Sequence, residues 1–128
     1  MEIKARSASP QDLRAYLLRE QQRLATEIRT RAVHGRAHAG YGNHIADDAT
    51  EVFEQTKHLA LRRGMERRLS EVQAALQRME DGGYGSCVTC GKRIDPARLR
   101  ALPSAGLCLS CQIRSEDRKG TSWDKTRR

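Results

Sequence analysis

The chain has 128 residues, of which 38% are hydrophobic and only 4% aromatic, so it is too poor in large apolar side chains to fill a sizeable globular core. Charged residues make up 31% and the formal net charge is +8, which favours an anionic partner such as nucleic acid or an acidic protein surface. No apolar run is long enough to cross a bilayer and no signal peptide is recognisable, so we expect a cytoplasmic protein without a membrane partner.

A first amphipathic helix is predicted from Pro10 to about Val33. Ser9 can cap this helix, and proline is favoured at a first helical position. The apolar side chains then recur at spacings of four, seven and four, which places them on one face: Leu13, Leu17, Leu24 and Ile28. Three glycines in residues 34–43 predict the break that ends the helix.

A second, longer helix is predicted from Ile45 to Glu80. Its apolar positions alternate in steps of four and three, in two series on either side of Gly64. The first series is Ile45, Ala49, Val52, Thr56 and Leu59, and the second is Met65, Leu69, Val72, Leu76 and Met79. The step of six between the series predicts a change of packing near Gly64. Two helices joined by a short Gly-rich turn predict an antiparallel αα-hairpin.

Four cysteines follow the second helix in the pattern C-x2-C-x17-C-x2-C: Cys87, Cys90, Cys108 and Cys111. Two such pairs suit tetrahedral Zn²⁺ and leave no open coordination position, so the site is predicted to be structural and to hold one zinc per chain. Two disulfides are one alternative, which the expected reducing compartment disfavours, and a redox-active CxxC is another, which the presence of two such pairs disfavours because it is not a thioredoxin pattern. His34, His38 and His44 are interpreted as solvated loop residues rather than as a second metal site.

Charge is distributed unevenly along the chain. Residues 41–56 contain Asp47, Asp48, Glu51 and Glu54 but no Lys or Arg, whereas residues 87–128 contain ten basic and four acidic side chains. The predicted hairpin places the acidic segment near its tip, at about residues 34–48. Asp47 has two interpretations from sequence: an exposed functional acid, or a residue at a helix N-terminus that the macrodipole stabilises.

Several residues around the cysteines extend the pattern beyond a generic zinc ribbon. Gly83-Tyr84-Gly85 precedes the first pair, Arg98-Leu99-Arg100-Ala101-Leu102-Pro103 lies between the pairs, and Gln112 follows the last cysteine. Together with the hairpin before them, these residues closely resemble the DksA/TraR family of bacterial zinc-finger proteins.

This resemblance implies a mainly α fold, in which a small C4 zinc finger follows a long coiled-coil hairpin. It also implies binding to the RNA polymerase core without binding to DNA. The coiled-coil tip would enter the secondary channel and alter initiation, in some cases together with ppGpp. The family tip motif D-x-x-D-x-A corresponds here to residues 44–49: Asp47 and Ala49 match it, Asp48 flanks them, and His44 replaces the first Asp.

The expected organisation is a lead-in and hairpin over residues 1–82, a zinc-finger module over 83–117 and a basic flexible tail over 118–128. No nucleophile–base pair or phosphate loop is recognisable, so we expect a non-enzymatic transcription regulator. The alternative is a nucleic-acid-binding module that uses the basic C-terminal third, although stacking aromatics are scarce. A third interpretation is a small adaptor that uses only its coiled coil.

Overall fold

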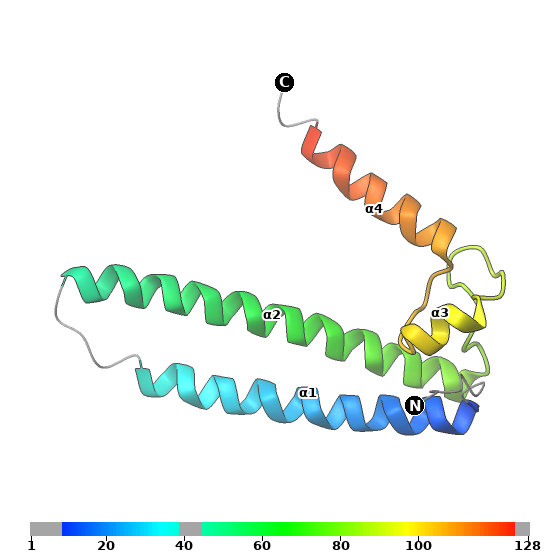
Figure 1. Ribbon diagram of the computed structural model, residues 1–128, viewed down its shortest axis with the longest axis horizontal. Coiled ribbons are helices and arrows are strands. Elements are labelled where there is room, and N and C mark those ends of the chain that lie inside the picture. The colour runs from blue at the N-terminus through cyan, green and yellow to red at the C-terminus, as the bar shows by residue number, and fades with distance from the viewer. Residues whose placement is uncertain (1–8, 39–44, 125–128) are drawn as a thin grey trace, which may run out of the picture. The chain divides into compact units, whose positions relative to one another are not determined.

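The computed structural model describes residues 9–38 and 45–124, with side chains over 9–32 and 49–119. Its helices are α1 (Pro10–His38), α2 (Ile45–Asp81), α3 (Pro96–Ala101) and α4 (Leu109–Asp124). Over the described ranges the structure has no β-strand and a single isolated β-bridge, which pairs Ser86 with Arg93. Helices α1 and α2 run antiparallel (Figure 1), so the predicted mainly helical hairpin is confirmed.

The chain divides into two compact units. One unit is Leu18–Gln73, which holds most of the hairpin, and the other combines Met1–Leu17 with Ala74–Arg128. The second unit therefore contains the cysteines together with the adjoining ends of α1 and α2. The division expected at residues 82/83 and 117/118 stays a prediction, and α4 crosses the second of these boundaries.

Helix α1 begins with a reciprocal pair of hydrogen bonds. The amide of Asp12 donates to Ser9 Oγ and the amide of Ser9 donates to Asp12 Oδ2, both at 3.2 Å. The helix then continues through Gly35 to His38, beyond the end predicted near Val33. A single glycine costs a helix only about 1 kcal/mol relative to alanine, and propagation of a formed helix offsets that cost.

The seam between the two helices is closed near the base of the hairpin. Leu17 and Leu24 of α1 are buried, as are Val72 and Ala75 of α2. The rest of the second predicted series, Met65, Leu69, Leu76 and Met79, is half-buried. The second predicted series therefore lies on the more buried side of α2.

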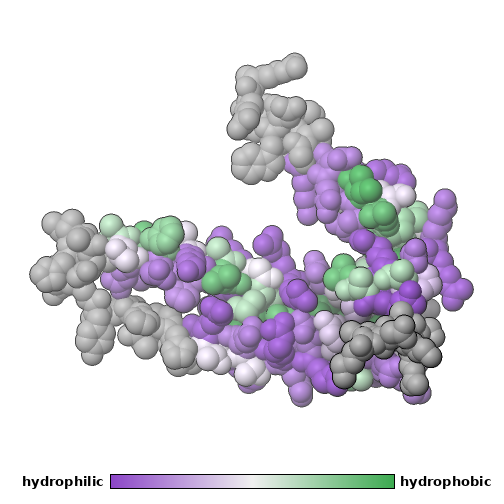
Figure 2. All heavy atoms as spheres, in the orientation of Figure 1, coloured by the Kyte–Doolittle hydropathy of each residue, from purple (hydrophilic) through white to green (hydrophobic). Residues whose placement is uncertain are grey.

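The first predicted series is wrong where its side chains are described. Ala49, Val52, Thr56 and Leu59 are all exposed, with 60% of Val52 and 48% of Leu59 accessible to solvent. Figure 2 shows hydrophobic surface on this part of α2. Helix α1 offers only Arg29, Thr30 and Arg31 between Ile28 and Ala32, so it lacks the large apolar side chains that a closed seam needs.

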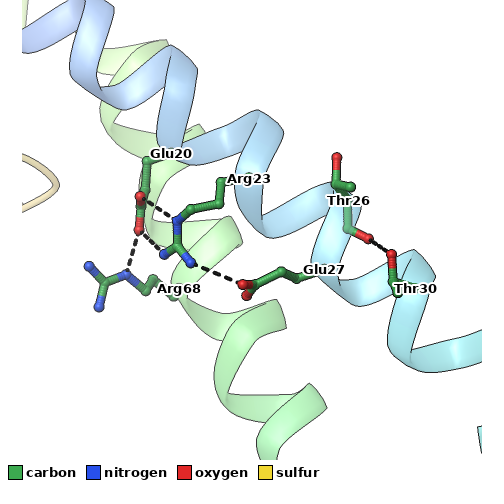
Figure 3. A network of polar contacts seen from close by, with 6 residues as sticks. All are labelled: Glu20, Arg23, Thr26, Glu27, Thr30 and Arg68. Atoms are coloured by element: carbon green, nitrogen blue, oxygen red, sulfur yellow. Dashed lines mark hydrogen bonds and ion pairs between the residues drawn. The ribbon is translucent and has the colours of Figure 1, made fainter. Parts of the chain in front are cut away.

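A buried carboxylate bridges α1 and α2 (Figure 3). Glu20 is 9% exposed and accepts two hydrogen bonds from Arg23, at 3.1 and 2.7 Å, and one from Arg68 of α2, at 3.1 Å. The hydrogen bonds from Arg23 lower the pKa of Glu20 below its ordinary value of 4.5, and the positive charges of Arg23 and Arg68 lower it further, against the opposing effect of burial. The ionised carboxylate thus stabilises the register of the hairpin.

Replacing Glu20 with glutamine should destabilise the hairpin in a pH-dependent way. Because the folded state lowers the pKa, the stabilisation is fully present above the ordinary value of 4.5 and is lost as pH falls through the folded-state pKa. We expect Glu20→Gln to lower the free energy of unfolding by about 1–2 kcal/mol at pH 7. Urea unfolding of both proteins between pH 7 and pH 3 measures the difference, which should shrink toward the acid end.

The matched control is Glu66→Gln. Glu66 accepts a hydrogen bond from Arg62 at 3.0 Å, but both side chains are nearly half exposed, so its removal should cost less than about 0.5 kcal/mol. Equal losses in the two variants, or a difference that does not change with pH, would contradict the role given to Glu20.

Gly64→Ala should stabilise the protein. Helix α2 is continuous through Gly64, the described side chains 52–63 before it are exposed, and a Cβ built on Gly64 meets no atom within 4 Å. Alanine is therefore expected to raise the free energy of unfolding by up to about 1 kcal/mol. Gly82→Ala is the control. A Cβ on Gly82 also meets no atom within 4 Å, but the φ of +81° at this position strains any residue other than glycine. Gly82→Ala should therefore lower the thermal unfolding temperature, whereas Gly64→Ala should raise it.

Candidate metal centre

The four cysteines meet in one cluster. Sulfur atoms of Cys87, Cys90, Cys108 and Cys111 all lie within 4.8 Å of one another, and Cys90 Sγ is 3.7 Å from Cys108 Sγ. Tetrahedral Zn²⁺ with bonds of about 2.3 Å needs sulfur–sulfur distances of about 3.8 Å. The cluster is therefore consistent with one structural zinc.

The first cysteine pair sits on a tight turn. The amide of Cys87 donates to the Lys92 carbonyl at 2.8 Å, and the amide of Gly91 donates to the Cys87 carbonyl at 2.9 Å. Gly91 has φ of +76°, a conformation that favours glycine, so this residue lets the chain turn tightly after Cys90. The amide of Ile94 closes the loop by donating to the Gly85 carbonyl at 2.7 Å.

The second pair opens α4. Cys108 precedes the helix and Cys111 lies in its first turn, where the amide of Gln112 donates to the Cys108 carbonyl at 2.9 Å. Helix α4 runs 16 residues, into the segment expected to be a tail. Arg98 of α3 fixes the approach to this pair by donating from Nε to the Leu107 carbonyl at 3.1 Å.

Helix α3 was not anticipated from the sequence. Asp95 caps it by accepting a hydrogen bond from the Ala97 amide at 2.9 Å, and Pro96 occupies its first turn. An Asp-Pro step is a helix-start signal, so this helix could have been found from the sequence. It places Leu99 with Ile94 in the small core under the cysteines.

The backbone around the cluster favours thiolates. The backbone amides of Cys108, Cys90 and Thr89 lower the pKa of Cys87 to about 6. The pKa of Cys108 is also lowered, first by the amide of Cys111. The hydrogen bond between the Cys111 thiol and Cys108 raises the pKa of Cys111 to about 12, and burial and the other neighbouring sulfurs act in the same direction. A divalent cation is the partner that relieves such crowding of thiolates.

The end of α2 is tied to the loop before the second pair. Nη2 of Arg78 lies 3.4 and 3.5 Å from the carbonyl oxygens of Ser104 and Ala105, and a Cβ at Gly106 would come within 3.2 Å of the same guanidinium. Tyr84 adds a hydrogen bond from its hydroxyl to the Pro103 carbonyl at 2.7 Å. Local sequence patterns give no sign of these contacts.

The predicted tip residues are described only in part. Asp47 and Asp48 lie in the first turn of α2, but their side chains fall outside the described residues, as does the whole of His44. Ala49 is exposed. Their action on a partner stays a prediction. The side chains of His34 and His38 are likewise outside the described part, within which the four cysteines are the only group that could hold a metal.

In the portion of the chain that the structure covers, every helix is too short or too polar to cross a membrane.

Comparison with known proteins gives consistent matches. A profile of the prokaryotic DksA/TraR C4-type zinc finger matches residues 82–117. General stress protein 16O of Bacillus subtilis (strain 168) is 36% identical over 96 residues, which cover 75% of this chain and 58% of that protein. The RNA polymerase-binding transcription factor DksA of Caulobacter vibrioides (strain NA1000 / CB15N) is 35% identical over 80 residues, covering 62% of this chain and 56% of that protein.

A solved structure agrees with these matches. The chain is similar to transcription factor DksA2 from Pseudomonas aeruginosa, with a TM-score of 0.72 and 29% identity over 84% of this chain and 82% of that one. The chain spans between 28% and 58% of the length of the curated relatives that it matches. The predicted C4-type zinc finger and the resemblance based on it are confirmed.

Proposed function

This chain belongs to the DksA/TraR family of C4-type zinc-finger proteins, and we propose that it is a non-enzymatic regulator of transcription that binds RNA polymerase. The observation that carries the proposal is the joint match of hairpin and finger to transcription factor DksA2 over most of both chains. Further relatives are named RNA polymerase-binding transcription factors. Function must still be argued from the surfaces that this chain presents, because a shared fold alone does not fix it.

The proposed partner is the core enzyme, and the proposed point of entry is its secondary channel. In support of this, α1 and α2 form an antiparallel hairpin, and both helices expose charged side chains, among them Arg19 of α1 and Arg63 of α2. Basic side chains of the hairpin could contact acidic channel walls: Arg14 is exposed, whereas Arg23 and Arg62 form ion pairs with Glu20 and Glu66. The tip would present Asp47, with Asp48 and Ala49 beside it.

The zinc is proposed to be bound by Cys87, Cys90, Cys108 and Cys111. Bound there, it would hold the two cysteine pairs together and so fix the finger against the end of α2 through Arg78 and Tyr84. It would supply no chemistry, because four thiolates fill its coordination sphere. We further propose a cytoplasmic location, since reduced cysteines require a reducing compartment. Joint action with ppGpp is proposed only as a property of the polymerase complex.

A pull-down with purified core RNA polymerase tests this function. The zinc-loaded full chain is immobilised and challenged with core polymerase, alone and with a large excess of duplex DNA. Retention of polymerase despite the DNA is the expected result. If DNA abolishes retention, or if the chain binds the duplex more tightly than it binds polymerase, the alternative of a nucleic-acid-binding module is favoured instead.

A further inference from the structure

A basic hollow lies beside the cysteine cluster and shares Cys111 with it. The hollow has a volume of about 300 Å³ and is lined by Thr89 and Leu107 and by one face of α4: Cys111, Arg114, Ser115, Arg118 and Lys119. All of these residues belong to one compact unit. Three of the seven are cationic and two carry hydroxyl groups, whereas none is acidic. Its volume is at the small end of the range for ligand pockets, roughly 300–1,000 Å³.

The composition of this face follows from helical periodicity. Residues three, four and seven positions after Cys111 share its side of the helix, and these are Arg114, Ser115 and Arg118. The two acids of this part of α4 do not line the hollow. Glu116 instead accepts a hydrogen bond from Gln112 at 3.0 Å. Helix α4 therefore places three cationic side chains along the hollow, and none of the residues that line it is acidic.

Neutralisation of the zinc–thiolate charge explains only part of this arrangement. Arg114 lies one turn from Cys111 and is close enough for that role. Lys119 lies eight residues after Cys111, which is roughly 12 Å along the helix axis. That separation exceeds the screening length of about 8 Å at physiological ionic strength, so an exposed lysine there contributes little to the metal site.

We propose that this hollow binds a phosphate group. Guanidinium groups match phosphate with paired hydrogen bonds, an ammonium adds a point charge, and the Thr89 and Ser115 hydroxyls supply further donors. The phosphate belongs either to a small phosphorylated molecule or to a nucleic-acid backbone. The site lies in the finger and α4 and does not depend on the proposed contact with polymerase.

The test is a titration of the full-length, zinc-loaded protein with inorganic pyrophosphate, followed by backbone amide chemical shifts. Saturable shifts are expected at Thr89 and over residues 114–119. Lys119→Gln should weaken pyrophosphate binding about tenfold, because it removes one charge-assisted hydrogen bond. The variant protein should still bind one zinc. Thr89→Val removes a donor without changing charge, so it should weaken binding about threefold.

The matched control is Lys92→Gln, which removes an exposed lysine from the first cysteine turn outside the hollow and should change the affinity less than about twofold.

A second titration uses a short DNA duplex. If the duplex shifts the same amides, and Lys119→Gln weakens that binding too, the phosphate belongs to a nucleic-acid backbone. If the duplex shifts none of them, the phosphate belongs to a small molecule. Shifts that do not saturate, or equal losses in Lys119→Gln and Lys92→Gln, would overturn the proposal by showing only diffuse attraction to a basic surface.

Discussion

Removal of zinc should unfold the finger and leave much of the α1–α2 hairpin helical. The buried core around the cysteines contains only three residues besides cysteine: Ile94, Leu99 and Ala105. Burial of a large apolar side chain such as Ile94 or Leu99 stabilises the folded state by about 1.5–3 kcal/mol. Ordering the backbone costs about 1–2 kcal/mol per residue, and the finger, residues 83–117, must order all of its residues. Structural zinc contributes about 10–16 kcal/mol in comparable modules, which is enough to decide the balance.

The hairpin has its own sources of stability. Leu24 and Val72 are buried in the seam, and Glu20 bridges the helices through Arg68. After chelation we therefore expect most of the helical circular dichroism signal to remain, while amide protection in the finger is lost. Metal analysis should give one zinc per chain before chelation.

Single substitutions separate metal loss from general damage. Cys111→Ser should lose zinc and reproduce the effect of chelation, because it removes a buried sulfur of the cluster. Ser110→Ala is the control, since Ser110 is exposed within the same cysteine pair and should keep the metal. A zinc content well below one per chain in carefully reduced wild-type protein, or finger amides that stay protected without metal, would contradict the prediction.

Local sequence patterns predicted most of the hairpin, because helical periodicity is a short-range property. The series from Met65 to Met79 is buried or half-buried, as an amphipathic stripe predicts. The same pattern failed for Val52 and Leu59 because an apolar stripe is buried only if its partner helix supplies apolar side chains opposite it. Residues 29–31 of α1 supply no apolar side chain, and which residues lie opposite one another depends on how two distant segments align.

Contacts across long separations in the chain were beyond sequence reasoning. Arg68 meets Glu20 across 48 residues, and Arg78 reaches Ser104 across 26. Lys and Arg are abundant in this chain, so no local pattern distinguishes these two arginines from solvated ones. The cysteine cluster was predictable because metal ligation demands a fixed residue type at a fixed spacing, and therefore leaves a clear pattern in the sequence.

Asp47→Asn should impair the effect of the protein on transcription while leaving polymerase binding largely intact. Asp47 lies in the first turn of α2, and we expect most of the area that contacts polymerase to lie along the hairpin and the finger. Asparagine keeps the size and the capping capacity of aspartate at a helix start, so the hairpin should persist. The substitution therefore removes one negative charge and little else.

The size of the effect follows from electrostatics in a confined channel. At an effective dielectric constant near 20, a unit charge about 8 Å from another contributes roughly 2 kcal/mol, and a catalytic Mg²⁺ centre carries more than one charge. We therefore expect the regulatory effect in run-off transcription to fall about tenfold, with a change in polymerase affinity of less than about twofold. His44→Asp, which restores the family tip motif, should strengthen the effect.

A charge-matched control distinguishes the tip from the general charge of α2. Glu54→Gln removes one negative charge from the same acidic segment, at an exposed position about two turns farther along the helix, and should leave transcription close to that of wild type. Run-off transcription and polymerase binding are measured on all four proteins at the same zinc content. If Asp47→Asn behaves like Glu54→Gln, the tip does not act through this carboxylate. If Asp47→Asn also loses polymerase binding, the tip serves to anchor the protein rather than to act on the catalytic centre.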